Sequence, residues 1–175
     1  MKRALILLSA ILLSVPAVAQ TVANGPYYAT PSWDQTLPPA QRFIVLANFN
    51  QQAVLDRETG LVWERAPDTT PRVWGFAQTL CLSKNVGGRK GWKLPSIQEL
   101  ASLVDPTTTG PALPLGHPFI GVQSFNYWSA TTATSPTTGT AARTVYFGDG
   151  GFSSVLKSDL VYAWCVRGGS GGEIQ

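Results

Sequence analysis

The stretch from Gly91 to Val104 constrains the fold most, because its turn chemistry and its apolar pattern predict the same short helix. Pro95 has a fixed φ and no backbone N–H, which suits the residue before a helix start. Ser96 is a favourable N-cap, and Glu99 follows at the spacing of a capping box. This spacing favours a capping role for Glu99 over a role as a catalytic acid. Apolar residues then recur along one helical face: Ile97, Leu100, Ala101 and Val104.

Residues 1–19 have the pattern of a bacterial signal peptide. Lys2 and Arg3 precede an apolar run over residues 4–18, which ends in the cleavage pattern Ala17-Val18-Ala19. We expect cleavage after Ala19 and a periplasmic or secreted mature protein. The run is too short to span a membrane comfortably, and no cysteine follows the cleavage site to carry a lipid. The sequence therefore predicts no stable membrane insertion.

The charge balance argues against nucleic-acid binding. The full chain has 13 Lys and Arg against 10 Asp and Glu. Because Lys2 and Arg3 leave with the signal peptide, 11 basic residues remain against the same 10 acidic ones. A nucleic-acid-binding domain needs a basic face or stripe, and the remaining charges are scattered. The mature chain of about 155 residues is long enough for one domain with a sizeable core.

Cys81 and Cys165 are the only two cysteines of the chain. An even pair in an exported protein is best explained as a disulfide. The alternative is two buried free thiols.

Turn and proline signals divide the mature chain into an arm, a domain and a tail. Residues 20–49 contain several prolines together with Tyr27, Tyr28 and Trp33. Disordered segments are poor in aromatic residues, so we expect an extended arm that wraps the domain, with a strand over 42–48. A single domain over residues 50–169 and a flexible tail over 170–175 complete the chain.

Periodic apolar residues predict the elements of this domain. Residues 52–66 form a hairpin with Asp56 and Gly60 in its turn. Residues 71–85 form a helix that buries one apolar stripe: Val73, Phe76, Ala77, Leu80 and Cys81. Residues 105–121 form a long irregular excursion, and 133–141 form a polar loop. The expected later strands are 126–132, 144–147, 152–156 and 160–167, with a hairpin turn at 148–151.

The reactive side chains offer little catalytic chemistry. His117 is the only histidine, which excludes a histidine-based metal site, and two cysteines alone cannot hold zinc. No G-x-S-x-G motif presents a nucleophilic serine. A carboxylate pair of Glu64 with Asp105 or Asp149 stays open, although turn, cap or solvated roles explain each acid more simply. We predict no cofactor, no metal and no catalytic residue.

The six tryptophans are candidates for the core or for a sugar-binding face. Trp63, Trp74 and Trp92 lie at periodic or motif positions and are predicted core residues. Trp128 and Trp164 lie in strands with small neighbours, so each could pack in the core or stack on a sugar. Core packing is favoured for every one of them, because the polar end of a buried tryptophan needs only one partner.

A set of motifs in chain order resembles one known family. They are Asp56-x-x-Thr59-Gly60-Leu61-x-Trp63, Trp74, Cys81, Gly88, Gly91-Trp92-Lys93-Leu94-Pro95-Ser96-x-x-Glu99-Leu100, Tyr127-Trp128-Ser129-x-Thr131-Thr132 and Cys165-Val166-Arg167. Over roughly residues 50–169 the chain is similar to the C-terminal domain of the Legionella collagen-like adhesin.

The resemblance implies an α+β, C-type-lectin-like fold related to the formylglycine-generating-enzyme domain. In that fold two helices pack on antiparallel strands among long irregular loops, and a helix cysteine pairs with a last-strand cysteine. The chain lacks the Glu-Pro-Asn triplet of calcium-dependent lectins and the cysteine pair of the formylglycine enzymes. We therefore expect neither of those activities.

We expect an exported, non-catalytic binding module whose ligand is a surface polysaccharide or a cell-envelope protein. Rigid scaffolds usually present function on loops, so the ligand surface is predicted on 105–126, 133–141 and 148–151. The predicted contact residues are His117, Trp128, Arg143, Asp149 and Lys157. One alternative is a structural subunit of an envelope or appendage assembly, in which the arm docks on a neighbour in an oligomer. The other is a hydrolase that uses a carboxylate pair.

Overall fold

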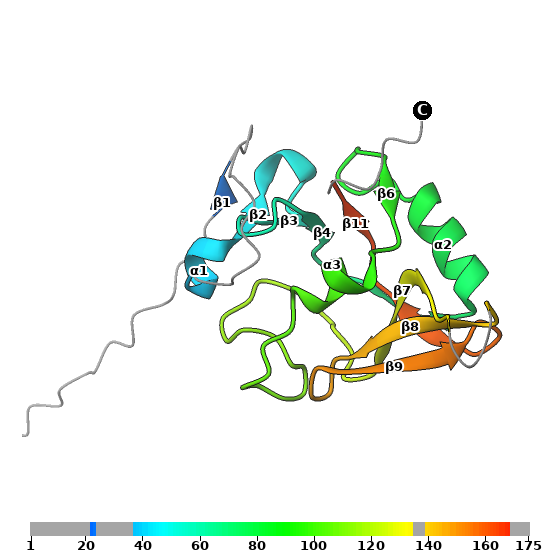
Figure 1. Ribbon diagram of the computed structural model, residues 1–175. Coiled ribbons are helices and arrows are strands. Elements are labelled where there is room, and N and C mark those ends of the chain that lie inside the picture. Colours follow the sequence, from blue (N-terminus) through cyan, green and yellow to red (C-terminus); the bar gives the residue numbers. More distant parts are fainter. Residues whose placement is uncertain (1–21, 24–36, 135–138, 169–175) are drawn as a thin grey trace, which may run out of the picture.

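Two β-sheets and three short α-helices make up the computed structural model, which describes residues 22–23, 37–134 and 139–168 (Figure 1). This arrangement confirms the predicted α+β class. The likeness to C-type lectins stays an expectation. The predicted signal peptide and the tail over 170–175 lie outside the described residues. Within the described ranges, no helix has the length and apolar character needed to cross a bilayer.

The first sheet contains six strands and is antiparallel except where β1 meets β2. In spatial order its strands are β1 (Val22–Ala23), β2 (Phe43–Leu46), β3 (Ala53–Asp56), β4 (Val62–Glu64), β11 (Val166–Arg167) and β6 (Trp92–Lys93). β2 confirms the strand predicted over 42–48. The helix α1 (Pro39–Arg42) precedes it, and the 3₁₀ turn η1 (Ala47–Phe49) follows it. Residues 37–49 of the predicted arm therefore contribute to this sheet.

The β3–β4 hairpin turns as the sequence predicted. The Asp56 side chain accepts a hydrogen bond from the Glu58 N–H (3.0 Å), and the Gly60 N–H donates to the Asp56 carbonyl (2.8 Å). Gly60 has a φ of 70°, a conformation that glycine adopts without steric cost.

A buried ion-pair cluster joins this hairpin to the residues before β2. The Arg42 guanidinium donates to both oxygens of the Asp56 carboxylate, at 2.9 and 2.7 Å, and to the Ser102 carbonyl at 2.6 Å. Its Nε also lies 3.5 Å from Glu58 Oε2. Arg42, Asp56 and Glu58 are each at most 2% exposed. Removing one partner of such a buried pair leaves an uncompensated charge, which costs about 3–5 kcal/mol.

The second sheet contains five strands and includes the predicted C-terminal hairpin. In spatial order its strands are β5 (Asp68–Arg72), β10 (Val161–Ala163), β7 (Asn126–Thr132), β8 (Ala141–Tyr146) and β9 (Gly151–Leu156). Only the β10–β7 pair is parallel. β7 has the predicted bounds, and β8 and β9 flank the predicted turn at 148–151.

The predicted last strand over 160–167 is divided between the two sheets. β10 lies between β5 and β7 in one sheet, and β11 lies between β4 and β6 in the other. Trp164 and Cys165 separate the two strands and are both buried. The Trp164 indole N–H donates to the Glu64 carbonyl (2.8 Å). The single-strand prediction was wrong, because one continuous apolar run can serve two sheets when a buried bend divides it.

The helix α2 (Trp74–Ser83) is shorter than the predicted helix over 71–85. Its start is delayed because residues 68–72 pair with β10 as β5. Ala77 and Cys81 are fully buried, as predicted, but Phe76 is 68% exposed. The prediction of a buried Phe76 was wrong, because the neighbouring elements cover only the centre of the apolar stripe.

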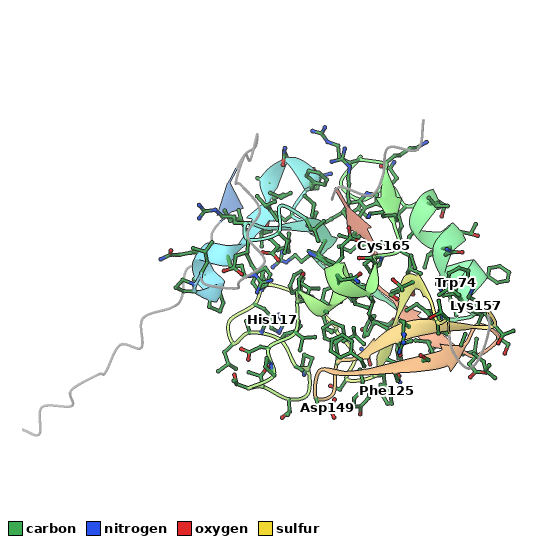
Figure 2. The ribbon with its side chains drawn as sticks, in the orientation of Figure 1. Trp74, His117, Phe125, Asp149, Lys157 and Cys165 are labelled. Atoms are coloured by element: carbon green, nitrogen blue, oxygen red, sulfur yellow. A yellow bond between two sulfur atoms is a disulfide. The ribbon has the colours of Figure 1, made fainter. Side chains whose placement is uncertain are left out.

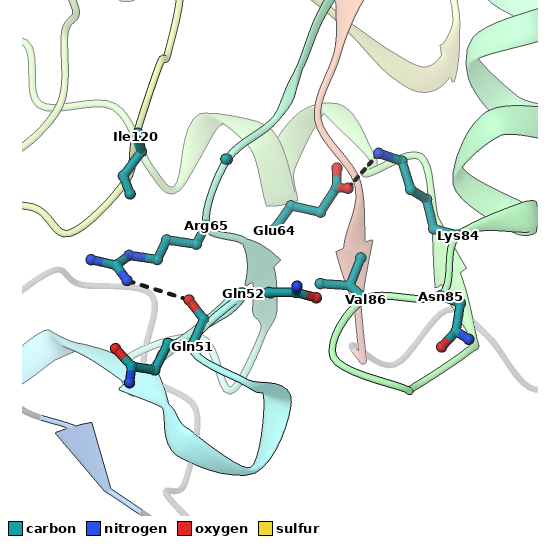
Figure 3. Close-up of a pocket in the computed structure, with 9 residues that line it drawn as sticks. Gln51, Gln52, Glu64, Arg65, Lys84, Asn85, Val86 and Ile120 are labelled. Atoms are coloured by element: carbon teal, nitrogen blue, oxygen red, sulfur yellow. Dashed lines mark hydrogen bonds and ion pairs between the residues drawn. The ribbon is translucent and has the colours of Figure 1, made fainter.

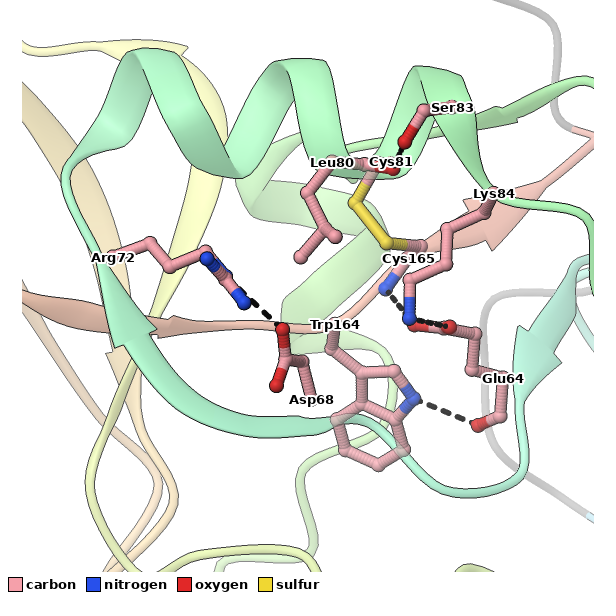
Figure 4. Close-up of a disulfide and its surroundings, with 9 residues drawn as sticks. All are labelled: Glu64, Asp68, Arg72, Leu80, Cys81, Ser83, Lys84, Trp164 and Cys165. Atoms are coloured by element: carbon pink, nitrogen blue, oxygen red, sulfur yellow. Dashed lines mark hydrogen bonds and ion pairs between the residues drawn. A yellow bond between two sulfur atoms is a disulfide. The ribbon is translucent and has the colours of Figure 1, made fainter.

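A disulfide between Cys81 and Cys165 ties α2 to the segment that joins β10 and β11 (Figure 4). The two Cα atoms are 5.3 Å apart, within the normal range for a disulfide. This finding confirms the predicted pairing and removes the alternative of two free thiols.

The helix α3 (Ile97–Ala101) begins with the predicted capping box. The Ser96 hydroxyl accepts from the Glu99 N–H (3.1 Å), and the Glu99 carboxylate accepts from the Ser96 N–H (2.8 Å). Lys93 donates to the other Glu99 oxygen at 2.8 Å. With both carboxylate oxygens engaged, Glu99 has the structural role that its spacing indicated.

Four of the tryptophans are almost completely buried: Trp63, Trp92, Trp128 and Trp164. Trp164 lies at the centre of an aromatic cluster, with its ring centroid 4.9 Å from Phe119 and 5.7 Å from Trp63. Such edge-to-face pairs are each worth about 0.5–1.5 kcal/mol beyond area burial. The excursion after α3 contains no helix or strand, as predicted, yet through Phe119 it contributes to this core.

Candidate functional site

A cavity of about 450 Å³ lies where β4, the segment after α2 and the excursion meet (Figure 3). Its volume falls within the range of small-ligand pockets. The lining residues are Gln51, Gln52, Glu64, Arg65, Ala66, Lys84, Asn85, Val86 and Ile120. Amide and charged side chains therefore share the pocket with a few aliphatic ones.

An ion pair between Glu64 and Lys84 is the main electrostatic feature of the pocket. Glu64 ends β4, and its Oε1 lies 2.7 Å from the Lys84 ammonium. The Glu64 side chain is only 3% exposed, against 24% for Lys84. Burial raises the pKa of Glu64, while the hydrogen bond and charge of Lys84 and the Cys165 N–H oppose that rise.

The disulfide positions both members of this pair (Figure 4). The Cys165 N–H donates to Glu64 Oε2 at 3.0 Å. Lys84 caps the C-terminus of α2, and its N–H donates to the Cys81 carbonyl at 3.1 Å. Because the cross-link fixes Cys81 beside Cys165, it holds the backbone that carries Lys84 close to Glu64.

The opposite wall of the pocket is held by Arg65. Its Nε donates to the Pro118 carbonyl (3.1 Å), and its carbonyl accepts from the Ile120 N–H (2.8 Å). A further hydrogen bond joins Arg65 Nη1 to the Gln51 carbonyl at 3.4 Å. These contacts attach the excursion to β4 and set the half-exposed Ile120 side chain at the pocket wall.

The loop after α2 closes the pocket and depends on a glycine. The Gly87 N–H donates to the Gln52 side-chain oxygen at 2.8 Å. Gly87 has a φ of 58°, and a Cβ at this position would lie 2.3 Å from the Phe49 carbonyl oxygen. Only glycine fits there, so the loop that carries Asn85 and Val86 has a defined path.

None of the five predicted contact residues lines this pocket. Trp128 is fully buried, and its indole N–H donates to the Arg72 carbonyl at 2.8 Å, so it presents no surface to a ligand. Arg143 is exposed on β8. Asp149 and Lys157 lie at the two ends of β9, away from His117 (Figure 2).

The remaining predicted residues have local partners. Lys157 donates to the Thr132 hydroxyl at 3.0 Å, and its ammonium lies 3.9 Å from the Trp74 ring centroid. Asp149 accepts from the Gly151 N–H within its turn (2.8 Å). His117 accepts from the Phe119 N–H (3.2 Å), and burial lowers its pKa. The structure therefore does not gather these residues into one site.

Sequence reasoning missed the pocket because Glu64 and Lys84 carry no shared local motif. Glu64 was considered only as half of a carboxylate pair with Asp105 or Asp149, whereas its charged partner is Lys84. Across the described ranges, no group of three or more His, Cys, Asp and Glu residues could hold a metal.

The sequence profile of the Lcl C-terminal domain matches residues 52–167, from β3 to β11. The chain belongs to the Lcl C-terminal domain family. This assignment confirms the resemblance inferred from the motifs. The Lcl C-terminal domain is a non-enzymatic, adhesin-associated family, which fits an exported protein with a disulfide. No curated protein matches the chain.

Proposed function

We propose that this Lcl C-terminal domain is the non-catalytic binding module of an exported protein and that it recognises a surface polysaccharide through the Glu64–Lys84 pocket. The observation that carries the proposal is the composition of this pocket. Sugar hydroxyls both donate and accept hydrogen bonds. The pocket offers amide groups, a carboxylate, an ammonium and a guanidinium within one concave surface.

The pocket favours an uncharged, hydroxyl-rich ligand. Lys84 is paired with Glu64 at 2.7 Å, so an anionic group would have to compete with a buried carboxylate for it. The Arg65 guanidinium in the pocket lining already donates to two backbone carbonyls, at 3.1 and 3.4 Å. Val86 and Ile120 supply aliphatic surface for the C–H faces of a sugar ring. Small-ligand sites commonly combine apolar walls with a few fixed polar groups.

The proposal replaces the loop surface expected from the sequence with the pocket as the main contact. Arg143, Lys157 and His117 belong to the predicted loop surface and lie outside the pocket. Their nitrogen donors suit sulfate or carboxylate groups. The two surfaces predict different ligands: neutral sugars for the pocket and anionic sugars for the loop residues. One panel of oligosaccharides can therefore distinguish them.

The test is calorimetric titration of the exported chain with neutral, carboxylated and sulfated oligosaccharides. We expect neutral sugars to bind and the variant Asn85→Ala to weaken that binding at least tenfold. Asn48→Ala changes another exposed amide that lies outside the pocket and serves as the matched control. Ile120→Ser tests the apolar wall and should also weaken binding.

Two results would overturn the proposal. The first is binding of neutral sugars that neither Asn85→Ala nor Ile120→Ser alters. The second is the absence of neutral-sugar binding up to about 1 mM, which corresponds to about 4 kcal/mol of binding free energy. Binding of sulfated sugars alone, lost in Arg143→Ala, would transfer the function to the loop surface.

A further inference from the structure

Strand β9 presents an edge that no other strand of the described structure covers. It ends the order of the second sheet, so β8 is its only partner strand among the described elements. Its six residues pair with β8 without a register shift. The sequence Gly-Phe-Ser-Ser-Val-Leu contains no charge and no proline. A regular, uncharged edge of this length is a template for another strand.

The other sheet edges in the described structure carry protective features. β1 and β6 are each two residues long, and β6 contains Lys93. β5 contains Asp68, Pro71 and Arg72, and its pairing with β10 is irregular. Short length, charge, proline and irregular pairing are the common means of blocking edge-to-edge association. β9 has none of them.

The free backbone groups of β9 belong to alternate residues. The Lys157 N–H donates to the Thr140 carbonyl at 2.9 Å, so the register places the residues that bond to β8 at odd numbers. The N–H and C=O groups of Phe152 and Ser154 and the N–H of Leu156 therefore point away from β8, whereas the Leu156 carbonyl accepts from the Asp159 N–H at 2.9 Å. Phe152 is 61% exposed and Leu156 is 47% exposed.

We propose that β9 pairs antiparallel with β9 of a second copy of this chain, with Ser154 opposite Ser154 across a two-fold axis. In this register Phe152 of each copy lies opposite Leu156 of the other. Two residues before Ser154 on one antiparallel strand face two residues after Ser154 on its partner. The two exposed apolar side chains of the strand then contact each other. Ser154 exchanges both of its backbone hydrogen bonds with Ser154 of the other copy, and each Leu156 N–H donates to the Phe152 carbonyl opposite.

The order of side chains along β9 favours a second copy in the antiparallel direction. A two-fold axis at Ser154 relates the two strands antiparallel and brings the same patch of each copy into contact, as in most homodimers. Phe152 and Leu156, the two exposed apolar residues of the strand, then meet each other on both sides of the axis. Outside the six paired residues lie the charged residues Asp149, Lys157 and Asp159. The self-complementary order of the strand therefore selects a second copy as the occupant of the edge.

The test is the mass of the purified exported chain measured by analytical ultracentrifugation over a concentration series up to about 1 mM. We expect a reversible monomer–dimer equilibrium. Ser154→Pro removes an outward N–H without disturbing the bonds to β8, and it should raise the dissociation constant at least tenfold. Ser154→Thr keeps the N–H and should leave the dimer intact. Circular dichroism establishes that both variants are folded.

A second pair of variants uses charge. Ser154→Lys places two ammonium groups opposite each other at the axis and should abolish the dimer, whereas Ser158→Lys adds the same charge in the exposed turn after β9 and should not. A chain that stays monomeric at every concentration would overturn the proposal. A dimer that survives both Ser154→Pro and Ser154→Lys would overturn it as well.

Discussion

Reduction of the Cys81–Cys165 disulfide should destabilise the domain mainly through its unfolded state. The cross-link joins residues separated by 84 positions. In the chain-entropy model a closed loop of this length lowers the entropy of the unfolded chain by about 15 cal/mol/K, which is about 4.6 kcal/mol at 25 °C. Small domains have a total stability of about 5–15 kcal/mol. The bridge is therefore expected to supply a large share of the free energy of unfolding.

Urea unfolding with and without a thiol reductant measures this contribution. Reduction removes the cross-link without replacing any side chain of the core. We expect the free energy of unfolding to fall by about 4–5 kcal/mol on reduction. The m-value should rise, because the unfolded chain without the cross-link exposes more surface. The variant C81A/C165A controls for the reductant, which should not change its unfolding curve.

A fall in the free energy of unfolding of less than about 1 kcal/mol on reduction would refute the reasoning. A loop of this length should strongly reduce the entropy of the unfolded chain. An unchanged m-value would also contradict it, because the cross-link would then leave the size of the unfolded chain unaffected.

Three further predictions concern single residues. Arg42→Met leaves the buried Asp56 and Glu58 carboxylates uncompensated, so urea unfolding should show a loss of about 3–5 kcal/mol; the exposed Arg57→Met should cost less than about 1 kcal/mol. Ser96→Ala removes the cap of α3 and should lower the unfolding free energy by about 1 kcal/mol, whereas Ser158→Ala in an exposed turn should not. Burial lowers the pKa of His117 below its usual 6.5, so its contribution to stability is complete above pH 6.5 and is lost as the pH falls through the lowered value. Thermal unfolding of His117→Asn should show a flatter pH dependence below pH 6.5, and an unchanged profile would contradict this assignment.

The sequence predicted correctly those helix starts and turns whose hydrogen-bond partners are close together in the chain. The Ser96–Glu99 capping box and the Asp56–Gly60 turn form the predicted hydrogen bonds because both partners lie within a few residues. The disulfide was predictable because a chain with two cysteines has one possible pairing. The cap and the turn could be predicted because neighbouring residues determine them. The disulfide could be predicted because only one pairing of the cysteines is possible.

Features that depend on distant partners were not predictable in this way. β5 was missed because residues 68–72 have no strand pattern and form a strand only beside β10. Phe76 satisfies the helical period, but it is 68% exposed because no element among the described residues covers it. Glu64 and Lys84 are brought together in the pocket by the folded hairpin and the disulfide, so no local sequence pattern predicts the pocket. The buried Trp128 follows the preference for core packing that the sequence indicated.

The bend at Trp164 and Cys165 has a consequence for the order in which the molecule can be completed. The last strands, β10 and β11, occupy interior positions in their sheets, with neighbours on both sides. Neither sheet can therefore close until the final residues of the domain have been synthesised and delivered. A chain of this design becomes a finished domain only when its carboxyl end arrives, and the Cys81–Cys165 disulfide can form only then.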